Sequence, residues 1–293
     1  MLSRHKFLGL LALVLFAGSA SASPTVYVVN GSKQFGTVNL GTGAFQQIGP
    51  LGPDGQSGLV RGPNGTLLTL AFSGNLDSID PATGVTSVIG RTGLGSCMSD
   101  SSPCGATSAA ALGELGGIVY ATDFSNNLYT VDPATGAATL VGLTGIPPFA
   151  FNPTVPIHDQ TFYGFDYSLF SAGGKLYQTF DVITIDFSSL TITPVIPAKL
   201  YEIDPSTAVA TLIAPTALGL TSVVNISGTL YAFNGAQQVV TLDLSNGNTT
   251  PIGSFDPAAG LILGASPVPE PASMALTAIG VFATYVVRRK RHL

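Results

Sequence analysis

The fold is decided by one stretch, Leu128-Tyr129-Thr130-Val131-Asp132-Pro133-Ala134-Thr135-Gly136-Ala137-Ala138-Thr139-Leu140-Val141-Gly142. Its two ends are rich in β-branched, aromatic and aliphatic residues, which favour strands. Between them, Pro133 presets φ for a turn, and the Asp132 carboxylate can accept backbone hydrogen bonds. Gly136 can take the positive φ that returns the chain into a second strand. The stretch therefore predicts a β-hairpin.

The same hairpin pattern occurs five times along the chain. The copies cover residues 36–49, 76–90, 128–142, 200–214 and 240–253. Each of the last four follows another pair of β-prone segments, in residues 58–70, 111–121, 169–177 and 223–232. Two strand pairs make a four-stranded antiparallel sheet of roughly 40 residues, which is the size of a propeller blade.

These repeats predict an all-β fold over residues 23–266, a five-bladed β-propeller of four-stranded antiparallel blades. A radial arrangement leaves only short, protected strand edges, whereas a flat array of sheets would expose long ones. A β-solenoid and a pair of β-sandwiches are the alternatives, but solenoid rungs are shorter and more regular than these units. Residues 181–199 are an insertion in the fourth blade and can form an extra hairpin.

The ends of the domain predict how the ring closes. Only one β-prone segment, 25–29, precedes the first hairpin, whereas every later hairpin has two. The segment Gly260-Leu261-Ile262-Leu263-Gly264-Ala265 resembles the segment that opens the second blade. We therefore expect residues 261–263 to form the innermost strand of the first blade, antiparallel to residues 26–29.

The charge distribution bears on possible partners. The net charge of −5 conceals an asymmetry, because six of the eleven basic residues lie at the two ends of the chain. Residues 23–270 hold five bases and all sixteen acids, a balance of −11. Such an acidic domain would repel a phosphate backbone, so we expect no nucleic-acid partner. A neutral or cation-rich polymer is compatible with this charge.

Residues 1–22 have the layout of a secretory signal peptide. A basic start at residues 4–6 precedes a short apolar run, and Ala20-Ser21-Ala22 supplies an A-x-A cleavage signal before Ser23. An N-terminal membrane anchor is the alternative, but the small-residue site between Ala20 and Ser23 favours cleavage. We therefore expect export.

Residues 267–293 carry a three-part tail. Val268-Pro269-Glu270-Pro271 leads into an apolar run over 272–287, and Arg288-Arg289-Lys290-Arg291-His292-Leu293 ends the chain. The run is a short transmembrane span, and the basic end would remain in the cytoplasm. An ordinary C-terminal anchor is the alternative to a processed tail.

The Pro-Glu-Pro, the span and the basic end, in that order, resemble the PEP-CTERM sorting signal of exported bacterial proteins. The resemblance covers about the last 26 residues. It implies recognition by an integral-membrane exosortase, a transpeptidase-like enzyme, and delivery to the surface of a cell that makes exopolysaccharide. It also predicts that the delivered protein lacks residues 274–293 and is membrane-anchored only before processing.

The two cysteines, Cys97 and Cys104, flank a short loop of turn-forming residues. In an exported chain, a disulfide that closes this loop is the favoured interpretation. A metal site is disfavoured because no second cluster of Cys or His accompanies them. We expect no cofactor.

Evidence for catalysis is sparse in the sequence. His158, beside Asp159, is the one histidine of the exported domain, and no G-x-S-x-G elbow supplies a serine nucleophile. A glycosidase would use a pair of carboxylates. The candidates outside the repeated turn are Glu114, Asp123, Asp159, Asp166, Asp181 and Glu202. Nothing in their spacing selects a pair, so we predict that the domain is not an enzyme.

One aromatic-rich segment is a candidate for ligand binding. Its residues are Phe162, Tyr163, Phe165, Asp166 and Tyr167. Aromatic faces stack on sugar rings and also on one another, so packing between blades is the alternative role. The sequence thus favours an exported, surface- or matrix-associated propeller without catalysis, which binds or scaffolds exopolysaccharide. A carbohydrate-active hydrolase or lyase on the same fold is the alternative.

Overall fold

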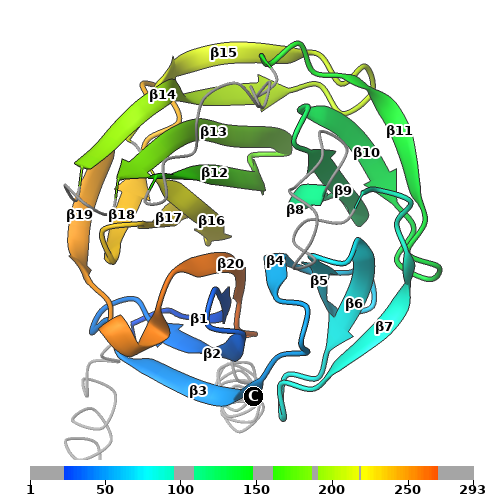
Figure 1. Cartoon of the computed structure of the whole chain (residues 1–293), viewed down its shortest axis with the longest axis vertical. Helices are drawn as coiled ribbons and strands as arrows, with labels where there is room; N and C mark the ends of the chain where they lie inside the picture. The colour runs from blue at the N-terminus through cyan, green and yellow to red at the C-terminus, as the bar shows by residue number, and fades with distance from the viewer. Residues whose placement is uncertain (1–22, 96–108, 148–160, 187–190, 218, 270–293) are drawn as a thin grey trace, which may run out of the picture.

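The computed structural model describes residues 23–95, 109–147, 161–186, 191–217 and 219–269. They form five four-stranded antiparallel sheets around a central axis (Figure 1). The predicted five-bladed β-propeller is therefore confirmed. The blades follow one another in chain order, except that the first blade takes its inner strand from the end of the domain.

From its inner strand to its outer one, blade 1 holds β20 (Ile262–Pro267), β1 (Thr25–Asn30), β2 (Gln34–Asn39) and β3 (Phe45–Pro50). In the same order, blade 2 holds β4 (Gln56–Arg61), β5 (Leu67–Ala71), β6 (Asn75–Ile79) and β7 (Thr86–Arg91). Blade 3 holds β8 (Ala109–Leu115), β9 (Ile118–Asp123), β10 (Asn127–Val131) and β11 (Ala138–Leu143). Blade 4 holds β12 (Thr161–Ala172), β13 (Lys175–Asp186), β14 (Thr191–Ile203) and β15 (Ala210–Pro215). Blade 5 holds β16 (Leu220–Ile226), β17 (Thr229–Asn234), β18 (Gln238–Leu242) and β19 (Thr249–Ser254), and a short 3₁₀ turn, η1 (Pro257–Ala259), precedes β20.

The ring closes through the pairing of β1 with β20. Val28 pairs with Ala265, and Val29 pairs with Gly264, in an antiparallel ladder. The ladder confirms that the last strand of the domain is the innermost strand of the first blade. The strand, Ile262–Pro267, begins and ends nearer the C-terminus than the expected 261–263. The reason is that η1 and its C-terminal residue Gly260 come first, and Leu261 lies outside the strand.

The repeated turn has the chemistry that the sequence predicted. In blade 3, Asp132 Oδ1 accepts a hydrogen bond from the Ala134 N–H at 2.9 Å, and Oδ2 accepts one from the Thr135 hydroxyl at 2.7 Å. The Gly136 N–H closes the turn on the Asp132 carbonyl at 2.8 Å, with φ of +78° at Gly136. In blade 4, Ala208 occupies the glycine position with φ of +66°.

Each outer strand contains a β-bulge at the same place. In blade 3, Leu128 pairs with Gly142 and Tyr129 pairs with Leu140, so Val141 is the extra residue. The corresponding residues in the other outer strands are Ile48, Ile89, Ile213 and Ile252. Val141, Ile48, Ile89 and Ile213 pack against the hydrophobic clusters. A bulge also bends an exposed edge and hinders pairing with another chain.

The outer strands contact one another head to tail around the ring. A Cβ atom on Gly90, near the end of β7, would collide with the carbonyl oxygen of Thr135 in the outer turn of blade 3. Backbone hydrogen bonds join successive blades at the same level, from Ala138 N to Thr92 O and from Ala210 N to Thr144 O, both at 2.9 Å. Thus the repeated turn also docks each blade onto the one before it.

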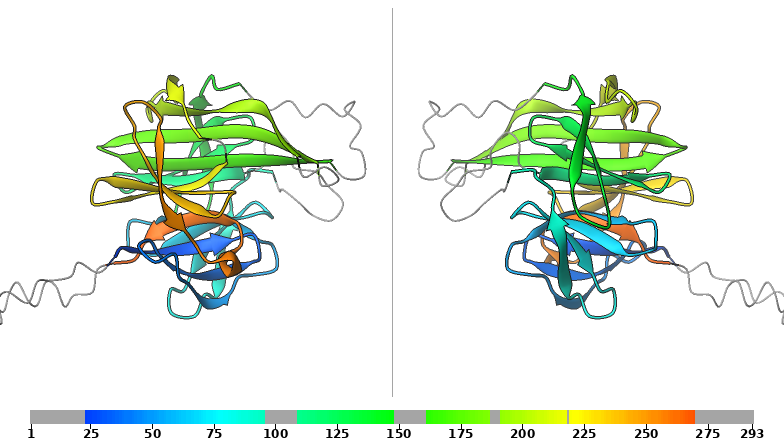
Figure 2. Two further views of the ribbon diagram at one scale, coloured as in Figure 1. Left: turned by 90° about the vertical axis from the view of Figure 1, so that its left-hand side faces the viewer. Right: turned by 90° about the vertical axis from the view of Figure 1, so that its right-hand side faces the viewer.

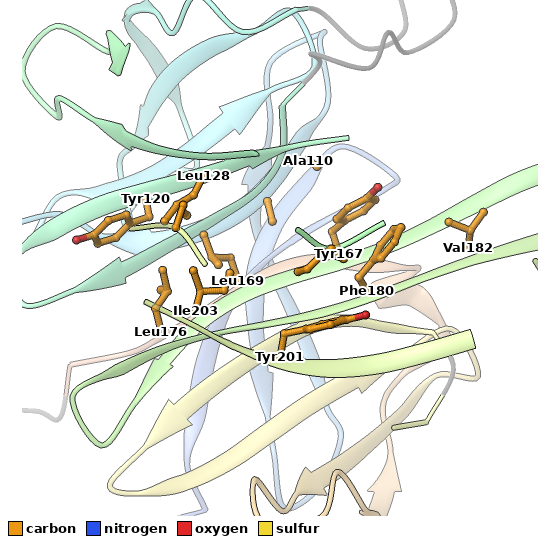
Figure 3. Packing of buried hydrophobic residues seen from close by; sticks show 13 residues of the cluster. Ala110, Tyr120, Leu128, Tyr167, Leu169, Leu176, Phe180, Val182, Tyr201 and Ile203 are labelled. Atoms are coloured by element: carbon orange, nitrogen blue, oxygen red, sulfur yellow. The ribbon is translucent and has the colours of Figure 1, made fainter. Parts of the chain in front are cut away.

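The hydrophobic core lies between the blades. In the described part of the chain, each of the five buried clusters takes its residues from two adjacent blades. Figure 3 shows the cluster between blades 3 and 4, where Leu128 of β10 lies near Leu169 and Leu176 of β12 and β13. Each blade therefore buries both faces, and near-continuous apolar strands such as β5 result.

Blade 4 extends beyond the others. Residues 161–166 of β12 pair with the end of β13, and β13 pairs with the start of β14, so three strands lengthen together. The insertion at 181–199 does not form a separate hairpin but continues β13 and β14. The side views show these long strands projecting from the ring (Figure 2).

Because of the head-to-tail contact, we expect alanine substitutions at two outer-strand glycines to differ in their effect on stability. Gly90→Ala should lower the free energy of unfolding by about 1–3 kcal/mol, because the new methyl group overpacks the joint with blade 3. Gly253→Ala is the matched control, since Gly253, like Gly90, directly follows the bulge residue of its outer strand but has no atom within 4 Å of an added Cβ. Urea unfolding of both variants measures the difference, and equal effects would contradict the proposed joint.

Ring closure predicts a sharp limit to truncation. A chain of residues 23–269 should unfold in one cooperative transition, whereas residues 23–260 should not fold. Without β20, blade 1 loses its inner strand, and the cluster shared by blades 5 and 1 loses Ile262 and Ala265. Circular dichroism and urea unfolding of both chains provide the test. Native-like cooperativity in the shorter chain would show that closure is dispensable.

Candidate functional site

A cavity lies on the propeller axis. It has a volume of about 350 Å³ and is lined by the five innermost strands, β4, β8, β12, β16 and β20. This volume is at the lower end of the range for small-ligand sites. The cavity thus offers room for a short ligand or for the end of a longer one.

The described lining of the cavity extends to the C-terminal ends of the inner strands. Its lining reaches the last or next-to-last residue of each strand there, namely Arg61, Glu114, Ser171, Asn225 and Pro267. We call these five residues the exit mouth. At the opposite ends, Gln56, Ala110, Leu220 and Ile262 are buried and do not line the cavity.

Side chains on the inner strands bridge neighbouring blades in the cavity wall. The Ser57 hydroxyl donates to the Ala110 carbonyl at 2.9 Å. The Val223 N–H donates to the Ser168 hydroxyl at 2.8 Å, and the Asn225 amide donates to the Ser171 carbonyl at 3.2 Å. These bonds satisfy part of the unpaired backbone edge that each inner strand presents to the axis.

Two charged groups stand at the exit mouth. The Arg61 guanidinium donates to the Gly65 carbonyl at 2.6 Å and to the Pro267 carbonyl at 3.2 Å. It therefore ties β4 to the end of β20. Glu114 Oε1 accepts the Gly117 N–H at 2.6 Å, which holds this carboxylate over its own turn. Both side chains are half-buried.

Three serines in the lining are Ser171, which is half-buried, and Ser222 and Ser266, which are buried. Among the described residues, no hydrogen bond engages the side-chain oxygens of Ser171, Ser222 or Ser266. Each hydroxyl can both donate and accept. Together with Arg61 and Glu114, they give the cavity mixed hydrogen-bonding capacity.

Tyr167 lies at the inner end of the cavity, but its ring is part of the interblade packing. It is 8% exposed, with ring centroids 4.7 Å from Phe180 and 5.2 Å from Phe124. Burial raises the pKa of its hydroxyl, and Asp123 and Asp181 raise it further, so the phenol stays protonated. Phe170, another lining residue, stacks on Tyr177 at 5.7 Å.

The other residues of the predicted aromatic site lie on the projecting part of β12. Phe162, Phe165 and Asp166 pair in register with Ile185, Val182 and Asp181 of β13, and Tyr163 pairs with Thr184. The side chains of Phe162, Tyr163, Phe165 and Asp166 are not among those that the structure describes. Ligand binding by the segment Phe162–Tyr167 therefore stays a prediction.

The described candidate carboxylates lie on several strands, and two of them, Asp166 and Asp181, pair in register between β12 and β13. Glu114 is the one acid in the described lining of the cavity. Asp123 is buried and accepts the N–H groups of Ser125 and Asn127 as well as the Tyr129 hydroxyl. Asp181 accepts the Gly219 N–H at 2.7 Å, and Glu202 pairs with Lys175 at 2.8 Å. His158 and Asp159 lie outside the described residues.

One buried carboxylate, Asp77 of β6, was not among the residues predicted from the sequence. It is 5% exposed, and its Oδ2 accepts the Gln56 side-chain amide at 3.0 Å. Burial raises the pKa of Asp77, the bond from Gln56 lowers it, and Asp54 raises it slightly. The signal was present in the sequence, because Asp77 lies inside a strand and not in the repeated turn. It does not belong to the described cavity lining.

The predicted processing sites fall at the edge of the described region. Ser23 and Pro269 are included, whereas Ala20, Ala22, Glu270 and Pro271 lie outside it, as does the span 272–287. The Val268 N–H donates to the Thr25 carbonyl at 3.3 Å, so the two ends of the domain leave side by side. Cys97 and Cys104 also lie outside the described residues.

Metal-binding and membrane-spanning features are absent from the same part of the chain. No group of three or more His, Cys, Asp or Glu side chains there is arranged to hold a metal ion. None of the helices in the described ranges has both the length and the apolarity needed to cross a bilayer.

Comparison with known protein families identifies the tail. Residues 267–291 match the model of the PEP-CTERM protein-sorting motif. The fold and this motif together define a class of protein, the exported propeller with a C-terminal sorting signal. This chain is an exported five-bladed β-propeller that carries a PEP-CTERM sorting motif, which implies exosortase processing of a membrane-anchored precursor. No curated protein sequence matches the chain.

Comparison with solved structures bears on the fold. A structural-genomics protein of unknown function from Bacteroides thetaiotaomicron VPI-5482 aligns with a TM-score of 0.50 and 12% identity, over 85% of this chain and 62% of that one. Virginiamycin B lyase from Staphylococcus aureus aligns with a TM-score of 0.33 and 14% identity, over 75% and 63%. The chain thus spans less than two thirds of either protein. The first likeness concerns the fold alone, and the second carries no argument about function.

Asp77 predicts an unusual pH dependence. Its pKa lies above the ordinary value of 3.8, so the folded state binds this proton more tightly than the unfolded state does. Its contribution to stability is therefore lost as the pH rises through the folded pKa. Asp77→Asn should raise the free energy of unfolding at pH 7 by about 1 kcal/mol, and the gain should disappear near pH 3.

Asp132→Asn is the control with the opposite sign. The Thr135 hydroxyl and the Ala134 N–H lower the pKa of Asp132 below 3.8, so its contribution is present above that pH and lost as the pH falls. The substitution should therefore destabilise the protein at pH 7. Urea unfolding from pH 3 to pH 7 checks both variants. A destabilised Asp77→Asn at pH 7 would contradict the assigned burial cost.

Proposed function

We propose that the protein is a non-catalytic, surface- or matrix-associated propeller that binds or scaffolds exopolysaccharide through its axial cavity. The observation that carries the proposal is the lining of that cavity, where hydroxyl groups, Arg61 and a single described carboxylate, Glu114, meet. Sugars offer many hydroxyl groups, and such a lining can both donate to them and accept from them. The volume suits a short oligosaccharide or the end of a chain.

The absence of catalysis is part of the proposal. A glycosidase that follows the common mechanism places two carboxyl groups about 5–10 Å apart, on either side of the scissile bond. Glu114 has no second carboxylate beside it in the described lining. The remaining candidates with described side chains do not line the cavity and are engaged in turns, backbone bonds or a salt bridge.

The proposed partners follow from the sorting motif. An exosortase-type membrane enzyme acts on the tail, and the released domain meets the polymer outside the cell. The acidic balance of the domain suits a neutral or cationic polysaccharide better than an anionic one.

Binding to a panel of neutral, cationic and anionic polysaccharides tests the proposal on processed protein taken from the cell exterior. Ser171→Ala and Ser222→Ala should each weaken binding about fivefold, since one hydrogen bond contributes on the order of 1 kcal/mol. Ser87→Ala, an exposed serine on the outer strand β7, is the matched control and should bind normally.

Release of reducing ends from the same panel separates binding from catalysis. We expect none. Release that Glu114→Gln abolishes would establish a hydrolase instead, and release of unsaturated products would indicate a lyase. Failure of the protein to bind any member of the panel would refute the proposed function.

A further inference from the structure

The cavity and the sorting tail share one end of the propeller. Pro267 is the last residue of β20, it belongs to the exit mouth, and it is the first residue of the matched sorting motif. Arg61 holds its carbonyl oxygen at 3.2 Å. The root of the tail is therefore part of the rim through which a ligand would enter.

The N-terminal end of the domain leaves at the same side. β1 is antiparallel to β20, so it begins where β20 ends, and the Val268–Thr25 hydrogen bond joins them there. The two ends of the domain lie opposite the projecting strands of blade 4 (Figure 2). Any anchor on the tail thus pulls on the face that carries the exit mouth.

The chain between the mouth and the expected span is short. Position 272 is five steps along the chain from Pro267, and an extended chain covers at most about 3.5 Å per step, or about 17 Å in all. The headgroup layer on one side of a bilayer takes up about 5–7 Å of that length. The exit mouth of an anchored chain therefore lies close above the lipid headgroups.

We propose that the membrane covers the exit mouth in the precursor, and that removal of the tail opens the cavity to polysaccharide. This regulation rests on the proposed binding function and on residues 272–287 acting as a membrane span. Its physical basis is steric. The short linker holds the domain so close to the bilayer that a bulky polymer cannot enter between them. Binding would then begin only after the protein has been released.

The opposite end of the propeller supplies an internal control. The turn between β1 and β2 lies there, because β1 starts at the exit side, and Ser32 in this turn is exposed. This end stays accessible whether or not the tail is anchored. In the anchored precursor, we therefore expect a bulky polymer to reach Ser32 at the far end but not Ser171 at the exit mouth.

Cysteine labelling tests the proposal without any ligand. Ser171→Cys and Ser32→Cys are made in the full-length chain and reacted with a bulky maleimide-coupled polyethylene glycol. The reaction is followed in precursor reconstituted into lipid vesicles and in processed protein. The chain without an added cysteine measures the background from Cys97 and Cys104. Thermal unfolding confirms that both variants keep the fold.

We expect Ser171→Cys to react at least about tenfold more slowly in the precursor than in the processed protein. This difference corresponds to a mouth that is uncovered a tenth of the time or less in the precursor. Ser32→Cys should react equally fast in both forms. Equal rates for Ser171→Cys in the two forms would overturn the proposal, as would slowing of both positions together. Because no polysaccharide is involved, a processed domain that binds none would refute the proposed function and leave this result intact.

Discussion

The antiparallel ladder between β1 and β20 is the constraint on which the rest of the structure depends. It joins two segments more than two hundred residues apart and gives blade 1 its fourth strand. With the ring closed, every blade has a neighbour on each side, and each hydrophobic cluster is shared by two blades. An open ring would leave two blade faces in water and would lose the apolar burial that stabilises them.

Much of this architecture could be predicted from local sequence. The Asp-Pro-Ala-Thr-Gly turn encodes its own backbone geometry, so five copies of the hairpin imply five similar sheets. The short first repeat also predicted closure, because a blade with three strands must find a fourth. The limits of β20 were less predictable, since η1 and the positive φ of Gly260 set where the strand begins. The continuation of β13 and β14 through the insertion depended on pairing that local propensity does not specify.

The candidate site was largely beyond sequence reasoning. The hydroxyl groups of Ser171, Ser222 and Ser266 come from three strands on three blades, and only the ring brings them together. Single serines in Gly- and Thr-rich segments carry no distinctive signal. The aromatic segment attracted attention by its density, yet Tyr167 contributes its ring to the core. Glu114 was recognisable as an acid outside the repeated turn, but its place as the one acid in the described lining of the cavity was not.

The last strand of the domain, β20, also has a mechanical role. A precursor held in the membrane by its tail experiences tension whenever its domain is drawn away from the bilayer. That force enters along β20, parallel to the strand, and loads the hydrogen bonds of its ladder with β1 together instead of one at a time. Arg61 adds a cross-link from the end of β20 to blade 2. The strand that closes the ring is thus placed to resist traction in shear, the direction in which a β-ladder is strongest.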